Sequence, residues 1–122
     1  MAALSFLQLP IDPDEGFPQS FRLSLAARVY QFRLSANVAE ELFDDAPAGL
    51  LALPAVGAFL VLAVDREGPS GLTTILRRKL VSGVEYHAAE LALTFRTMLL
   101  DPRNVNGIGS FGSQVVGGVA LR

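Results

Sequence analysis

The segment GIGSFG at residues 107–112 has the G-x-G-x-x-G spacing that cradles a pyrophosphate in dinucleotide-binding proteins. That chemistry needs a strand before the first glycine, a helix that begins at the last one, and an acidic residue about 20 positions later. Gly117 and Gly118 make the following residues a poor helix, and no acidic residue follows Asp101. We therefore expect no nucleotide site, and instead a glycine-bearing strand pair or a segment that lies along another backbone.

Side chains that commonly carry catalysis or bind metals are scarce in this chain. It has no cysteine and a single histidine, His87, whereas a zinc site needs three or four protein ligands. The serines lie outside the G-x-S-x-G pattern of a hydrolase nucleophile. The acidic residues Asp12, Asp14 and Glu15 lack the ligand spacing of a calcium-binding EF-hand loop. The sequence thus predicts no enzyme activity, no catalytic residue, no cofactor and no metal, and it predicts His87 at a strand edge or an interface.

The composition limits the classes of partner. Of the 122 residues, 51% are hydrophobic and 18% are charged, against an ordinary charged share of about 25%. A single domain of this length has much surface, so some apolar side chains must face outward, where they usually mark protein contacts or membrane contacts. The net charge of −2 gives no electrostatic reason to expect specific nucleic-acid binding.

An uncharged run at residues 46–64 is close to the shortest helix that spans a bilayer. However, Pro47, Gly49, Pro54 and Gly57 lie inside the run, and a proline within a helix costs about 3 kcal/mol. The flanking charges also show no lysine or arginine bias toward one side. We expect no stable membrane insertion, and instead an apolar loop near residues 46–57 that leads into a buried strand.

Alternating apolar and polar residues predict most of the strands. The expected strands lie at residues 21–25, 30–36, 58–64, 72–81, 91–98 and 111–121. Ala26 and Ala27 are expected to form a tight hairpin turn, although the usual Gly or Asn is absent. Asn37 and Glu40 match a helix-capping box, which predicts one short helix between residues 38 and 45.

Together these elements predict one all-β domain over residues 1–122. We expect a small β-barrel or β-sandwich of about six or seven mostly antiparallel strands, with one short helix and a Gly-rich C-terminal segment at residues 107–122. The side chains expected to point into the core are Phe32, Leu34, Phe59, Val61 and Phe95, with Arg33 pointing outward.

Two stretches carry a pattern found in a known family. The first is LQLPIDPDEGFPQSFRLSLAARVYQFRLSANV, and its matching residues are Pro10, Phe21, Leu25, Tyr30, Phe32, Leu34 and Asn37. The second is FLVLAVDREGPSGLTTILRRKLVSGVEY, in which Leu80, Val81 and Gly83 match the family's L-V-x-G element. In these frames the chain resembles the cyanophage-type baseplate plug proteins of tailed bacteriophages.

The resemblance implies a structural virion protein, made in the host cytoplasm and located in the tail baseplate. It would be a plug-like hub subunit at the tail tube–baseplate junction, with other tail, baseplate and hub proteins and copies of itself as partners. The alternative is a small cytoplasmic β-barrel that binds an apolar ligand.

For a subunit of a symmetric assembly, the sequence offers two contact segments. The first is apolar and too irregular to pack as one helix face, and the second has glycines that another backbone can approach. The candidate subunit contacts are Leu50, Leu51, Leu53, Val56, Gly107, Gly109, Phe111 and Gly112. Alternatively, both segments fold back over the domain's own core.

Overall fold

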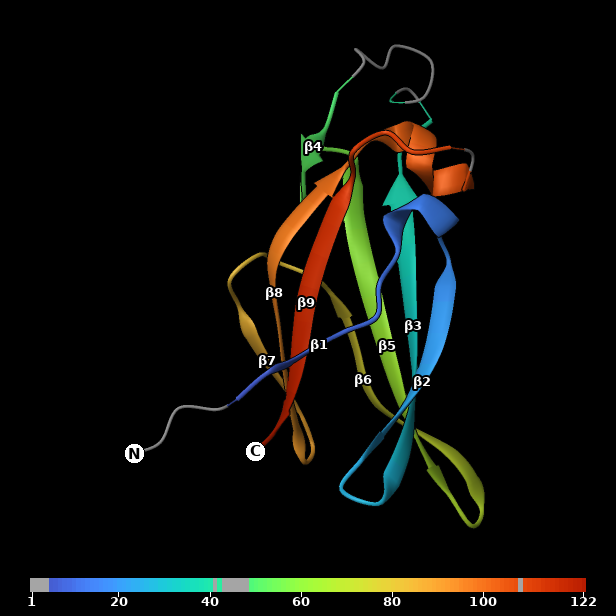
Figure 1. Ribbon diagram of the computed structural model, residues 1–122, viewed down its shortest axis with the longest axis vertical. Coiled ribbons are helices and arrows are strands. Elements are labelled where there is room, and N and C mark those ends of the chain that lie inside the picture. The colour runs from blue at the N-terminus through green and yellow to red at the C-terminus, as the bar shows by residue number, and fades with distance from the viewer. Residues whose placement is uncertain (1–4, 41, 43–48, 108) are drawn as a thin grey trace.

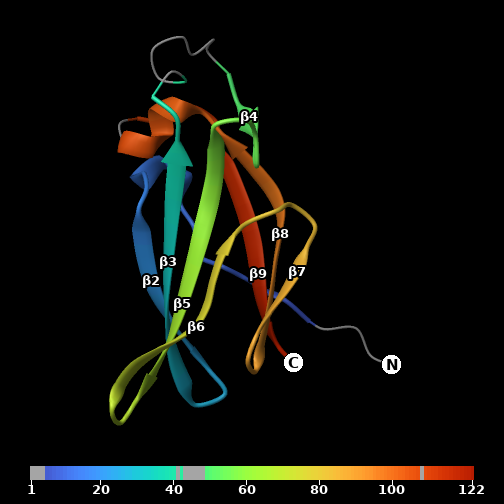
Figure 2. The same ribbon diagram turned by 180° about the vertical axis from the view of Figure 1, so that it is seen from behind.

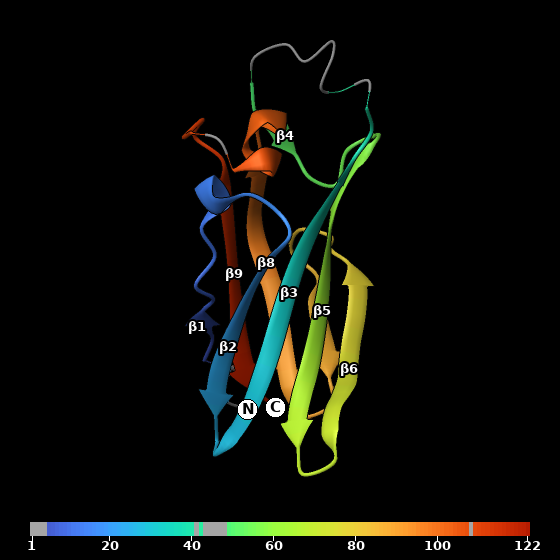
Figure 3. The ribbon, with the colours of Figure 1, turned by 90° about the vertical axis from the view of Figure 1, so that its right-hand side faces the viewer.

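The computed structural model describes residues 5–40, 42, 49–107 and 109–122. Within them, two antiparallel sheets pack face to face, as Figures 1, 2 and 3 show from three sides. The expected all-β fold is confirmed, and of the two expected architectures the sandwich is the one formed, because the sheets do not close into a barrel.

One sheet, here called the β5 sheet, contains β2 (Gln19–Leu25), β3 (Arg28–Val38), β5 (Ala58–Gly68) and β6 (Gly71–Lys79), in that order. The expected turn between β2 and β3 is confirmed, since Ala26 and Ala27 have φ values of 48° and 63°. Positive φ at both central residues suits the twist of a two-residue hairpin, even without glycine. The turn between β5 and β6 is shorter than the expected strands at residues 58–64 and 72–81 imply, because Arg66 and Glu67 still belong to β5.

The other sheet, the β9 sheet, is built around β9 (Gln114–Leu121), which lies between β1 (Leu7–Gln8) and β8 (Leu91–Leu100). Two short strands pair with the other edge of β8: β7 (Glu85–Ala88) at its start and β4 (Leu51–Ala52) at its end. The alternation pattern predicts neither β4 nor β7, because strands this short contain too few residues to show a period. His87 is exposed on β7, whose described strand partner is β8.

The core lies between the sheets and is filled by large side chains. The largest with less than 2% exposure are Tyr30, Phe32, Phe95, Leu34, Leu60, Leu62, Leu80, Leu91, Leu93 and Leu100. The expected burial of Phe32, Leu34 and Phe95 and the exposure of Arg33 are confirmed.

The expected burial of Phe59 and Val61 is wrong. Both are only half-buried on the outer face, because β5 turns Ala58, Leu60, Leu62 and Val64 toward the core. The run AFLVLAV is apolar on both faces, so its composition does not distinguish the two possible phases.

A bulge in β8 changes which face points inward. Register with β9 shifts between Phe95 and Thr97, so the buried set continues through Met98 rather than Thr97. Gly117 lies against the Phe95 ring, where an added Cβ would stand 2.5 Å from Cε2. Because Gly117 has no side chain, β9 leaves room for the buried Phe95 ring of β8.

The helix expectation is wrong at its start, because Asn37 lies within β3 and does not cap a helix. Residues 41 and 43–48, on which the rest of that expectation depends, lie outside the described residues. Two short 3-10 turns are present elsewhere: η1 (Pro13–Glu15) and η2 (Pro102–Asn106). The final strand begins at Gln114, so the expected strand at residues 111–121 is three residues too long.

Candidate functional site

The two candidate contact segments lie at the same end of the sandwich. Figures 1 and 3 show β4, η1, η2 and the start of β9 together at the top of the molecule. We call this region the capped end and define it as η1 with its N-cap Asp12, η2, residues 50–57 (which include β4) and residues 109–113. Segments from both halves of the chain therefore form one candidate surface.

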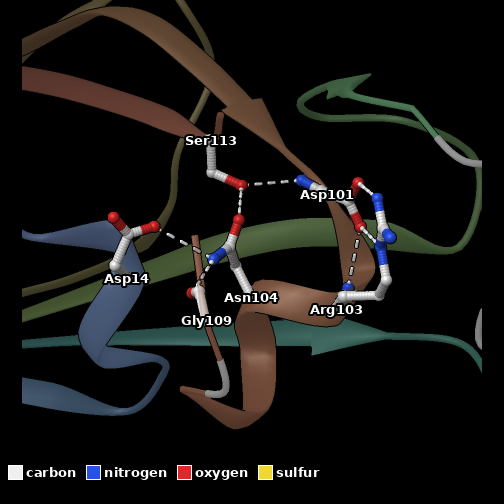
Figure 4. A network of polar contacts seen from close by, with 6 residues as sticks. All are labelled: Asp14, Asp101, Arg103, Asn104, Gly109 and Ser113. Atoms are coloured by element: carbon white, nitrogen blue, oxygen red, sulfur yellow. Dashed lines mark hydrogen bonds and ion pairs between the residues drawn. The ribbon is translucent and has the colours of Figure 1, made fainter. Parts of the chain in front are cut away.

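A fully buried asparagine organises the capped end (Figure 4). The amide nitrogen of Asn104 donates hydrogen bonds to Asp14 Oδ1 at 3.1 Å and to the Gly109 carbonyl at 3.2 Å. Its oxygen accepts a hydrogen bond from the Ser113 hydroxyl, whose oxygen in turn accepts from the Asp101 N–H at 2.8 Å. One side chain thus joins η1, η2 and the Gly-rich segment.

Asp101 begins η2 and is the second buried polar residue of this region, with 2% exposure. Its carboxylate accepts hydrogen bonds from the Arg103 N–H, Nε and Nη2 at 2.8–3.0 Å. Hydrogen bonds from Arg103 lower the pKa of Asp101, and this lowering is larger than the rise that burial causes. The carboxylate therefore stays charged as a cap, and Arg103 also covers the Phe111 ring at 4.0 Å.

Sequence reasoning treats residues 101–104 as a break between strands and does not identify this network. The signal that could have found it is Asp101 followed by proline, a common start for a helical turn. Nothing in the sequence distinguishes the buried Asn104 from the exposed Asn106 two residues later.

The glycine of the fingerprint that ends η2 makes a backbone contact. Gly107 has a φ of 70°, and an added Cβ would lie 2.7 Å from the Glu15 carbonyl oxygen. Gly16 lies on the other side of this contact, with an added Cβ 2.6 Å from the Gly107 nitrogen. The expected close approach of another backbone is present, but that backbone belongs to this chain.

The remaining candidate contacts divide between core and surface. Leu53, at 3% exposure, belongs to the core and is not available to a neighbour, and Leu51 packs against the core while pairing with Leu100. Leu50 and Val56 are exposed at 42% and 98%. Phe111 is half-buried, and Gly109 and Gly112 are exposed with positive φ. The candidate surface is therefore reduced to Leu50, Val56, Phe111 and the two exposed glycines.

Replacement of Asn104 by alanine tests whether the network holds the capped end together. We expect Asn104→Ala to lower the free energy of unfolding by about 1–3 kcal/mol, because buried partners lose their hydrogen bonds. Urea unfolding followed by circular dichroism measures the change. The matched control is Asn106→Ala, an exposed neighbour that should change stability by less than about 0.5 kcal/mol. Equal effects of the two substitutions would contradict this account.

A second polar cluster joins the sheets at the other end. Glu90, in the turn between β7 and β8, accepts hydrogen bonds from Arg66 of β5 at 2.5–3.1 Å and pairs with Arg28 at 3.6 Å. Hydrogen bonds from Arg66 lower the pKa of Glu90. Among the described residues, the buried Tyr30 hydroxyl has no hydrogen-bond partner of good geometry, and its pKa is raised first by burial and then by the nearby Glu90 carboxylate. Because Arg66 and Arg28 belong to the β5 sheet and Glu90 joins two strands of the β9 sheet, these contacts link the two sheets.

The fingerprint at residues 107–112 lies in a different local structure from a dinucleotide-binding loop. Gly112 is followed by β9, so a strand takes the place of the helix on which a pyrophosphate would rest.

Among the residues that the structure describes, no three His, Cys, Asp or Glu side chains gather closely enough to hold a metal ion.

In the same described part of the chain, no helix has the length and apolar character needed to cross a membrane. The end of the uncharged run forms β5 instead.

The chain matches no protein-family model, no curated protein and no solved structure.

Proposed function

We propose that this protein is a non-catalytic structural subunit of a tailed bacteriophage virion, a plug-like part of the baseplate hub where the tail tube begins. The proposal starts from the resemblance of the two sequence frames to the baseplate plug family. Several of the residues that carry the resemblance lie on or beside strands of the β5 sheet. Leu25 ends β2, Phe32 and Leu34 are core residues of β3, and Leu80 is the buried residue just after β6.

The observation that best supports an assembling subunit is the capped end. Asn104 ties η1, η2 and the Gly-rich segment together there, and Val56 and Leu50 of the same end are exposed at 98% and 42%. Buried polar contacts order η1, η2 and the Gly-rich segment before any partner binds, so these three segments lose little conformational entropy on contact. Burial of one such side chain against a neighbour contributes roughly 1.5–3 kcal/mol. An ordered end with outward apolar side chains suits a protein that docks against others.

The alternative, a barrel that binds an apolar ligand, has less support. Such a protein keeps its binding site between its sheets. Here Tyr30, Phe32, Phe95 and several leucines occupy that space.

Labelling of particles tests the proposed function. In purified virions of the phage that encodes this chain, we expect an antibody against it to label the baseplate end of the tail. Tail-less heads from the same preparation serve as the control and should stay unlabelled. Uniform labelling of capsids, or no chain detected in intact particles by mass spectrometry, would contradict the proposal.

A further inference from the structure

Three exposed cations lie together on the outer face of the β5 sheet. Arg33 of β3 and Arg77 of β6 both pair with Ala63 of β5, so the three residues form one row across the sheet. In the neighbouring row, Lys79 pairs with Val61. Directly paired residues in adjacent strands point to the same side, and Leu62 and Leu34 point to the core. Arg33, Arg77 and Lys79, here called the basic face, therefore point outward.

The β5 residues that lie between and beside the three cations are apolar. Ala63 separates the two arginines, while Val61 and Phe59 are half-buried on the same side of β5. Lys79 lies over the Phe59 ring at 4.6 Å. An apolar centre with charges around it is the usual arrangement of a protein contact surface.

No member of the basic face forms an ion pair within the described ranges. Two acidic residues of β5 lie near this face. Glu67 is paired with Arg22 at 2.8 Å and hydrogen-bonded to Gln31; Asp65 keeps its charge and accepts a hydrogen bond from Thr74 at 2.7 Å, but it forms no ion pair with the basic face. The basic face is thus available to an anionic partner from outside the molecule.

The capped end carries the opposite charge. Asp12 and Glu15 at η1 are exposed, and neither forms an ion pair with another described residue. The exposed Val56 and Leu50 belong to the same end. Figures 1 and 3 show η1 at the top of the molecule, whereas Figure 2 shows β3, β5 and β6 running along its side. The acidic residues of η1 and the basic face therefore lie on different parts of the molecule, and each has apolar side chains in its own region.

We propose that the capped end of one copy docks on the basic face of the next, with Asp12 and Glu15 facing Arg33 and Arg77. This contact deepens the proposed function and rests on it, because it supplies the self-assembly of a hub subunit. The two surfaces differ, so the contact is heterologous. Repetition of such a contact produces a ring when the rotation closes.

The contact is tested by neutralising one surface at a time. One variant carries Arg33→Gln and Arg77→Gln, and the other carries Asp12→Asn and Glu15→Gln, which keeps an N-cap side chain at position 12. Arg96→Gln, an exposed arginine on the β9 sheet, is the matched control. Sedimentation velocity at low salt should show self-association of the wild type and of the control, weakened about tenfold or more in each double variant. In about 1 M salt, where the Debye length is about 3 Å, the wild type should dissociate as well.

Mixing the two variants identifies the contact as heterologous. Each retains one intact surface, so an equimolar mixture should form a one-to-one complex and nothing larger. A monomeric wild type at low salt, or double variants that associate like the wild type, would overturn the contact.

These outcomes are separate from those of the particle experiment. If the chain is found at the baseplate while the variants still assemble, the contact fails and the proposed function stands. If the variants dissociate while virions lack the chain, the contact stands and the proposed function falls.

Discussion

Replacement of Phe95 by alanine is expected to lower the free energy of unfolding by about 3–5 kcal/mol. The ring has 0% exposure and fills the space that Gly117 leaves open on β9. Removal of the ring creates a cavity that the rigid strand pair cannot close. Urea unfolding at neutral pH, followed by circular dichroism, measures the loss.

Phe59→Ala is the matched control, because it removes the same side chain from the outer face of β5. There the ring is half-buried, and we expect a loss of about 1–2 kcal/mol. A larger loss for Phe59 than for Phe95 would mean that the inward faces of these strands are misassigned.

Gly16→Ala is expected to destabilise the protein by about 2–5 kcal/mol. Two effects add. Gly16 has a φ of 80°, which strains an alanine, and its Cβ would lie 2.6 Å from the Gly107 nitrogen and 2.9 Å from the Val105 carbonyl oxygen. Both atoms belong to the backbone, so relief requires η1 and η2 to separate.

Gly112→Ala isolates the first effect, the backbone strain. Gly112 has nearly the same φ, 82°, but nothing lies within 4 Å of an added Cβ. Only backbone strain remains there, and we expect a cost of about 1–2 kcal/mol. Thermal unfolding of both variants tests the difference. Equal midpoints would show that the backbone contact at Gly16 contributes nothing.

The long strands could be predicted from the sequence because each has enough residues to show a period of two. Phe32, Leu34 and the outward Arg33 follow from this alternation. It fails where the pattern is ambiguous or interrupted. β5 is apolar on both faces, so its phase depends on which neighbour covers it, and the bulge at Phe95 changes the phase of β8 partway along.

The candidate site could be predicted only in part. The glycine-bearing segment predicts the close approach of another backbone, and Gly107 makes such a contact, with a positive φ as well. Its partner, Glu15–Gly16, lies far away in the sequence and leaves no local signal. The same holds for Asn104, whose partner Asp14 is 90 residues away. Nothing in the sequence distinguishes Leu53 from its exposed neighbours, but Leu53 is buried because β4 brings it beside β8.

The division of the chain between the two sheets has a consequence for biogenesis. The β5 sheet is built from residues 19–79, with hairpins that join β2 to β3 and β5 to β6 and a longer connection from β3 to β5. Its cover, apart from β1 and β4, is made by residues 85–121. Local hairpins form quickly, and contacts between distant segments form later. On the ribosome, the strands that carry the inner face with Phe32 and Leu62 therefore emerge before β8 and β9, which cover it. Until then a broad apolar surface is open to water, and the nascent chain depends on chaperones or on rapid completion to avoid aggregation.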